Sequence, residues 1–132
     1  GTVRDDEIDP RQAPTNVQFV GKVARDAVRD WYEWADLFVL PSLFEGSATV
    51  TYEAMASGLP VICTEQTGSV VEHGETGLIV PARSSDALVE AIVGLDRGVL
   101  NRWSRNVLTG SRRWDATRYG AELVGATRRV LK

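Results

Sequence analysis

The 132-residue chain has little of what several classes of protein depend on. It has a single cysteine, Cys63, which excludes an internal disulfide framework and any metal site built from several cysteines. No apolar run approaches the roughly 18 residues of a transmembrane helix, and no stretch has the pattern of a secretory signal peptide. These absences favour a cytoplasmic protein.

The lone cysteine and the lone histidine are both expected to be structural. Cys63 lies in the apolar run PVICT, where a free cysteine usually behaves as a small buried hydrophobe rather than as a nucleophile. His73 lies in the stretch VVEHGETG, with no evident partner that would make it a general base. We therefore expect a buried Cys63 and a His73 on the surface of a loop.

The charges are distributed unevenly along the chain. Residues 1–96 carry 6 Lys and Arg against 16 Asp and Glu, a balance of −10, whereas residues 97–132 carry 9 against 2, a balance of +7. The basic segment is either a solvated helical face paired with the acidic remainder, or a surface for an acidic partner or anionic lipid headgroups. The lipid alternative would place the protein peripherally at the inner face of the membrane. Nucleic acid is not expected as a partner, because aromatic residues are not interleaved with a basic face.

The length fits one domain, and the apolar pattern begins at about residue 16. Residues 1–15 are polar and contain two prolines, which is typical of a flexible lead-in or loop. Over residues 16–132 the patterns typical of strands and helices alternate. The expected strands are at 16–21, 37–40, 60–64 and 77–81, and the expected helices are at 25–35, 49–57, 84–98, 99–111 and 115–131.

The apolar character of the strands predicts how they are arranged. Strands that are apolar throughout are buried on both faces, which is typical of a parallel sheet covered by helices. We therefore expect an α/β fold with a doubly wound, Rossmann-like parallel sheet of about four strands, flanked by helices. Trp31 and Trp34 lie on the apolar stripe of the first helix, so we expect them to cover the core or an interface rather than to stack on a ligand.

The stretch EGSATVTYE, at residues 45–53, lies where ligands of such sheets bind, at the carboxyl end of a strand. The free N–H groups and the positive dipole end of the helix that starts there suit a phosphate. Small side chains just before the helix let the backbone approach a ligand closely. The residues concerned are Gly46, Ser47, Ala48 and Thr49.

Two carboxylates frame this stretch. Glu45 precedes the expected helix, and Glu53 lies about one turn after its start. The separation suits a nucleotide diphosphate, with Glu53 accepting both ribose hydroxyls and Glu45 facing the opposite end of the ligand. Spacing alone leaves the alternative open, in which Glu45 is a partner of the helix dipole and Glu53 is an exposed helix residue.

More of the chain fits one pattern. The E-x7-E pair is preceded by FVLPS and followed by EAMASGLPVI. VQFVGKV at 17–23, GSVVEHGETGLIVP at 68–81 and SSDALVEAI at 84–92 continue the pattern along the chain. Together these motifs resemble the carboxyl-terminal, donor-binding domain of the family-4 glycosyltransferases, which have the GT-B fold. The resemblance covers about residues 16–131.

The resemblance implies an enzyme that moves a sugar from a UDP- or GDP-sugar donor to an acceptor and retains the anomeric configuration, without a bound metal or a cofactor. It implies that Glu45 is the catalytic-site residue, contacting hydroxyls of the donor sugar, and that Glu53 binds the ribose. The other donor-binding residues it implies are Gly46, Ser47, Ala48 and Thr49 around the diphosphate, and Gly21, Lys22 and Val23 beside the base.

The chain departs from the family pattern in three respects. Gly46-Ser47-Ala48 replaces a glycine-phenylalanine-glycine run, the arginine and lysine that hold the diphosphate have no counterpart, and the amino-terminal acceptor-binding domain is absent. We therefore expect a partial domain, inactive alone, whose acceptor (a glycan, a lipid or a small molecule) would bind the absent domain. An exposed sheet edge would favour a homodimer. The alternative is a non-catalytic interaction domain that docks through its basic carboxyl-terminal helices.

Overall fold

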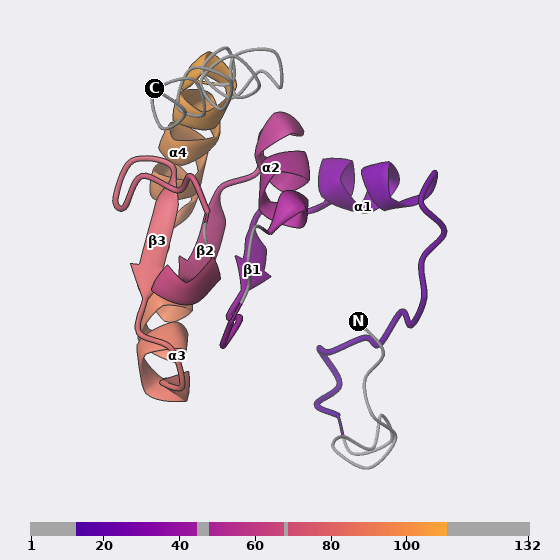
Figure 1. The fold of residues 1–132 in the computed structure, drawn as a ribbon, viewed down its shortest axis with the longest axis horizontal. Helices are drawn as coiled ribbons and strands as arrows, with labels where there is room; N and C mark the ends of the chain where they lie inside the picture. The colour runs from indigo at the N-terminus through magenta and orange to yellow at the C-terminus, as the bar shows by residue number, and fades with distance from the viewer. Residues whose placement is uncertain (1–12, 45–47, 68, 111–132) are drawn as a thin grey trace, which may run out of the picture.

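Three parallel strands form the sheet in the computed structural model, which describes residues 13–44, 48–67 and 69–110. The strands are β1 (Phe38–Leu40), β2 (Val61–Thr64) and β3 (Gly77–Val80), paired in the order β1-β2-β3. The helices are α1 (Val28–Trp34), α2 (Thr49–Ala56), α3 (Ser85–Val93) and α4 (Arg97–Gly110), with a short 3-10 turn, η2 (Glu65–Thr67), after β2. Figure 1 shows α3 at the end of the sheet where β3 finishes, with α2 and α4 nearer the opposite end.

β2 is the centre of the core. All four of its residues are buried, because it has a parallel neighbour on each side and a helix packed on it. The fit against β3 is close: a Cβ added to Gly77 would lie 1.8 Å from the carbonyl oxygen of Val61, so only glycine fits there. The parallel, helix-covered sheet predicted from the apolar strands is confirmed.

α2 packs on β1 and β2 and against α4. It ends where the sequence predicts, because Gly58, with φ of +84°, adopts the left-handed conformation that stops a helix. The hydroxyl of Ser104 in α4 donates a hydrogen bond to the Gly58 carbonyl at 2.8 Å, and Trp103 and Val107 of α4 are buried beside it. α4 therefore fixes the carboxyl end of α2, the helix that carries Glu53.

The strand predicted at residues 16–21 is wrong. The segment is irregular, Val17 and Phe19 are exposed, and Figure 1 shows this part of the chain, in indigo, apart from the sheet. A β-rich composition forms a strand only where a neighbouring strand takes its backbone hydrogen bonds. The Val17 amide instead donates to the carbonyl of Pro14 in a local turn. The described sheet accordingly has three strands rather than about four.

The helix predicted to run from Ser84 to Gly98 is shorter than expected. The sequence allows Ser84 or Ser85 as the cap, and the Ser84 side chain caps the start of α3. The helix ends with Gly94 as its C-cap, because the carboxylate of Asp96 accepts a hydrogen bond from the Val99 amide at 2.8 Å and starts the next helix. Gly98 therefore lies in the first turn of α4 instead of ending α3.

The two tryptophans of α1 are not in the core. Trp31 and Trp34 are 38% and 78% exposed, and their rings meet edge to face at 5.8 Å. α1 packs on the core through Tyr32 and Ala35 instead. A helix has one buried stripe, and the two tryptophans lie beside that stripe rather than on it.

The two residues expected to be structural are placed as predicted. Cys63 is buried in β2. His73 is exposed in a loop, where its Nδ1 accepts a hydrogen bond from the Ile79 amide at 3.0 Å. The predicted helix at 115–131 and most of the lead-in at 1–15 lie outside the described residues. Within the described ranges, no helix has both the length and the apolar character needed to cross a membrane.

Candidate functional site

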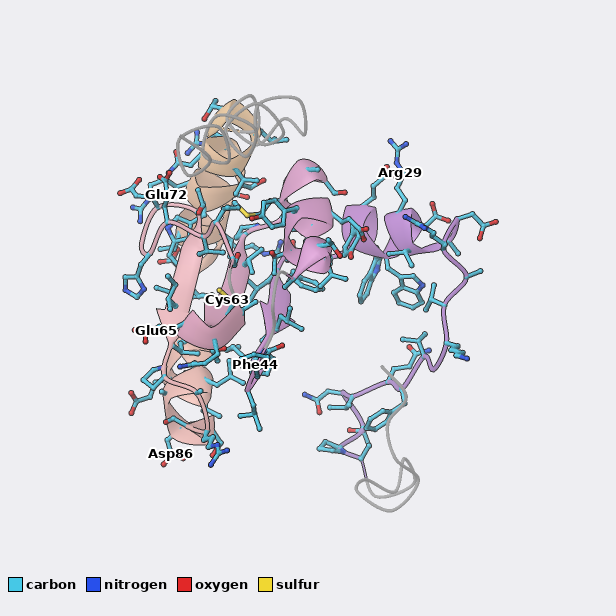
Figure 2. The ribbon with its side chains drawn as sticks, in the orientation of Figure 1. Arg29, Phe44, Cys63, Glu65, Glu72 and Asp86 are labelled. Carbon is cyan, nitrogen blue, oxygen red and sulfur yellow. The ribbon has the colours of Figure 1, made fainter. Side chains whose placement is uncertain are left out.

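The carboxyl ends of the three strands border a hollow of about 310 Å³. Its lining comes from the residues that finish the strands and from the start of α3: Pro41, Leu43, Thr64, Val80, Pro81, Arg83, Ser84, Ser85 and Leu88. The Thr64 hydroxyl donates to the carbonyl of Ser42, which ties the β1–α2 connection to the end of β2. Figure 2 shows Phe44, the residue before Glu45, at the same end of the sheet as Glu65. Parallel α/β sheets bind their ligands at this edge.

Among the residues that the structure describes, no side chain caps the start of α2, which follows that connection. Its N-cap is Ala48, which is buried and has no side-chain atom that could accept a hydrogen bond. Alanine is disfavoured at an N-cap because the first amides of the helix are then left without a side-chain acceptor. α3, by contrast, is capped by Ser84. The open start of α2 therefore suits an anion supplied by a ligand.

Glu53 lies one turn further along α2, beside a second hollow. This hollow, of about 310 Å³, lies between α1 and α2 and is lined by Arg25, Val28, Arg29, Tyr32, Glu53, Ala56 and Ser57. The volume is near the lower end of the range for small-molecule sites. Glu53 is an exposed residue, and its Oε2 accepts a hydrogen bond from the Tyr32 hydroxyl at 3.4 Å. The carboxylate is therefore in the wall of a hollow and has a specific partner.

Tyr32 is held so that its hydroxyl remains a donor. Its ring is half-buried and meets the Phe38 ring of β1 edge on, with the centroids 5.8 Å apart. Burial raises the pKa of Tyr32 above its usual range, and the charge of Glu53 and the hydrogen bond to Glu53 raise that pKa further. The hydroxyl is consequently protonated at neutral pH, as a donor to a carboxylate must be.

The predicted site residues fall into three groups. Those on α2 or at its start are Ala48, Thr49 and Glu53. Those outside the described residues are Glu45, Gly46 and Ser47. Those in the irregular segment before α1 are Gly21, Lys22 and Val23. The structure brings the first group to one helix, and the roles of all nine residues stay predictions.

Three residues that no sequence pattern marks as site residues line the hollow beside Glu53: Arg25, Arg29 and Tyr32. Their separations of four and three positions are those of one helix face, a signal that the apolar pattern of the same helix obscures. The Arg29 guanidinium pairs with Glu33 at 2.7 Å. This hollow therefore contains two arginines, although the sequence has no counterpart of the family's diphosphate-holding arginine and lysine.

Two other expectations concern metals and the basic carboxyl-terminal segment. In the described part of the chain, no three His, Cys, Asp or Glu residues gather as metal ligands would. α4 carries Arg97, Arg102 and Arg105, all exposed. Arg97 pairs with Asp36 at 2.7 Å, as expected if the basic segment pairs with the acidic remainder. The second basic helix lies outside the described residues.

The class of the protein follows from the fold and this edge of the sheet. A helix-covered parallel sheet with a hollow at its carboxyl ends is a Rossmann-like α/β unit. The model of the family described as glycosyl transferases group 1 matches residues 1–96, and the chain belongs to this family.

Individual relatives agree with this family. The chain is 35% identical over 114 residues to the GDP-mannose-dependent alpha-(1-6)-phosphatidylinositol monomannoside mannosyltransferase of Mycobacterium tuberculosis, covering 76% of this chain and 30% of that protein. It is 40% identical over 79 residues to the lipopolysaccharide core biosynthesis mannosyltransferase of Rhizobium meliloti, covering 57% and 22%. The sucrose-phosphate synthase of Thermosynechococcus elongatus, of the GT-B fold, matches with a TM-score of 0.71 at 28% identity, covering 87% of this chain and 31% of that one. The chain thus spans less than a third of each of these relatives.

Proposed function

We propose that the chain is the donor-binding part of a retaining glycosyltransferase, which moves a sugar from a UDP- or GDP-sugar to an acceptor. Its family supports glycosyl transfer, and the name of the mycobacterial relative specifies GDP-mannose as the donor of that protein. The leaving group of such a reaction is a nucleoside diphosphate, so the main electrostatic task of the site is to stabilise its growing negative charge.

One observation supports this proposal most directly: α2 starts at the carboxyl edge of the sheet with no side-chain cap from the described residues, and carries Glu53 one turn later. An uncapped helix start offers amide donors and a positive dipole to a diphosphate. A carboxylate one turn away accepts hydrogen bonds from the ribose hydroxyls of the same ligand. The two features together match the ends of a nucleoside diphosphate.

The remaining roles are those that the resemblance to the family implies. Glu45 contacts hydroxyls of the sugar, where the glycosidic bond to phosphate breaks. The backbone around the helix start holds the diphosphate, through Gly46, Ser47, Ala48 and Thr49. The residues that border the base are Gly21, Lys22 and Val23. No metal or cofactor enters this scheme.

The partners and the location belong to the same proposal. The acceptor, a glycan, a lipid or a small molecule, binds a further domain, so we expect no turnover from this chain alone because a donor site by itself does not orient an acceptor. We expect a cytoplasmic protein, with the basic segment able to touch the inner membrane face. We also expect the chain to form homodimers.

Nucleotide binding tests the donor site directly. We expect UDP or GDP to bind weakly in a ligand-observed NMR titration, and Glu53→Ala to raise the Kd about tenfold or more, since hydrogen bonds to a charged group contribute about 1.5–3 kcal/mol. Glu90→Ala is the matched control, because it removes an exposed carboxylate from α3 instead. Its Kd should equal that of the unmodified chain.

Two results would contradict the donor site. One is that neither nucleotide binds, and the other is that Glu53→Ala binds as well as the control variant. Either would favour the alternative of a non-catalytic interaction domain that docks through its basic carboxyl-terminal helices.

A further inference from the structure

Tyr32 connects the sheet to the carboxylate of Glu53. Its ring lies against Phe38 of β1, at 5.8 Å between centroids and 77° between planes, and it packs on the buried core. Its hydroxyl reaches Glu53 Oε2 at 3.4 Å. The base of the tyrosine is therefore fixed by the core, while its polar end touches an exposed carboxylate in the neighbouring helix.

An exposed glutamate needs such a partner if it is to recognise two hydroxyls at once. Its side chain has several rotatable bonds, and holding it in one rotamer costs conformational entropy each time a ligand binds. A carboxylate offers about four acceptor positions, so a hydrogen bond from one tyrosine leaves enough for two ribose hydroxyls. A partner that orders the carboxylate beforehand lowers the cost of binding.

Arg29, one of the two arginines of the hollow, is paired with a residue other than Glu53. Arg29 lines the same hollow as Glu53, but its guanidinium is taken by Glu33 at 2.7 Å. Figure 2 shows the Arg29 side chain pointing outward from α1. A bidentate arginine would occupy both carboxylate oxygens and compete with the hydroxyls, whereas the hydroxyl of Tyr32 engages one.

We propose that Tyr32 is a positioning residue that orients the Glu53 carboxylate toward the 2′ and 3′ hydroxyls of the donor's ribose. The inference rests on the proposed role of Glu53 in binding that ribose. It predicts that Tyr32 sets the preference for ribose over a sugar without these hydroxyls, rather than the general affinity for a nucleoside diphosphate.

The test compares a nucleoside diphosphate, UDP or GDP, with its 2′,3′-dideoxy counterpart by ligand-observed NMR. The measured quantity is the Kd of the dideoxy nucleotide divided by the Kd of the ribonucleotide. A general loss of stability would not change this ratio. We expect Tyr32→Phe, which keeps the ring against Phe38, to reduce the ratio about fivefold, or about 1 kcal/mol. Glu53→Gln should reduce it at least as much. Ser57→Ala is the control, because Ser57 lines the same hollow but its hydroxyl donates to the Glu53 main-chain carbonyl.

The outcomes separate this inference from the proposed function. An unchanged ratio in Tyr32→Phe, together with a reduced ratio in Glu53→Gln, would overturn the role of Tyr32 and leave the donor site intact. A chain that does not distinguish the two nucleotides at all would overturn both. If thermal unfolding shows that Tyr32→Phe does not fold, Tyr32→Met, which also lacks the hydroxyl, replaces it and must reduce the ratio equally.

Discussion

Cys63 lies in the middle of the central strand, and its surroundings determine how its thiol titrates. Burial raises the pKa of this thiol above its usual range. In the unfolded chain the thiol titrates at about 8.5. The folded protein therefore holds this proton more tightly than the unfolded chain does at alkaline pH.

We expect the free energy of unfolding to fall as the pH rises above the pKa of the unfolded thiol. The sign follows from linkage: over that window the native state binds more protons than the unfolded state, so stability decreases with pH. Urea titrations between about pH 7.5 and 10 measure the effect, since the window opens near the thiol's unfolded pKa of about 8.5. Tyr32, whose pKa is also raised, acts in the same direction at higher pH.

Cys63→Val distinguishes the contribution of Cys63 from that of Tyr32, because it removes the thiol and keeps an apolar side chain of similar size. The stability of this variant should change less between the two pH limits than that of the unmodified chain. If the free energy of unfolding falls equally with pH in both proteins, the Cys63 thiol is not the cause of the fall. Slow labelling of the native thiol by a disulfide reagent is an independent check, since only an opened strand exposes it.

The starts of α2 and α3 differ in one side chain, and the difference is testable at the level of whole helices. α2 begins with Ala48 and α3 with the capping serine Ser84. If α2 is left uncapped for a phosphate, Ala48→Ser should stabilise the fold by up to about 1 kcal/mol and weaken nucleotide binding, because the new hydroxyl competes for the same amides. Thermal unfolding and NMR titration of one sample measure both quantities.

Asp96→Ala is the matched change on another helix, because the Asp96 carboxylate caps the start of α4 and lines neither hollow. It should destabilise the fold by about 1 kcal/mol and leave nucleotide affinity unchanged. A gain in stability at Ala48→Ser without any loss of nucleotide affinity would contradict an anion site at α2. Weaker binding in both variants would show that the loss of affinity is not specific to the start of α2.

The sequence predicts elements well where one cause dominates their structure. PVICT forms a strand because three of the four residues of β2 are apolar and all four are buried between strands on both sides. Residues 16–21 also contain β-favouring residues but form no strand, because a strand depends on a distant neighbour that composition does not reveal. The predicted end of α3 is wrong for a local reason, because Asp96 caps the next helix before Gly98 can stop the previous one.

The candidate site is predictable only in part for a similar reason. The position of Glu53, one turn after the start of α2, follows from the geometry of a single helix. The contact of Glu53 with Tyr32 joins residues 21 positions apart, and it depends on how α1 packs on β1 and against α2. The apolar stripe of α1 shows that it packs, but the sequence does not indicate which of its polar atoms reaches the neighbouring helix.

At the scale of the whole molecule, β1 is one of the two edges of the described sheet, and we expect homodimers to form through it. Among the described strands it pairs with β2 alone. The Phe38 amide donates to the Pro60 carbonyl at 3.0 Å, so by the alternation of a parallel ladder the backbone groups of Val39 face the open side. Unpaired groups on an edge are a template for another strand.

We therefore expect concentration-dependent association in sedimentation velocity, weakened by Val39→Pro. Proline removes the amide that faces the open side, a position where an edge strand tolerates it, and its ring also blocks an approaching strand. The loss of an intermolecular hydrogen bond together with this block should weaken association at least about tenfold.

Trp34→Ser distinguishes the edge from the other surface that could hold two copies together. Trp34 is the more exposed tryptophan of α1, and removing it leaves the backbone groups of β1 unchanged. If the edge joins the copies, Val39→Pro weakens association and Trp34→Ser does not. If only Trp34→Ser weakens it, the apolar side of α1 is the contact, because burial of aromatic surface rather than strand pairing then supplies the free energy of association.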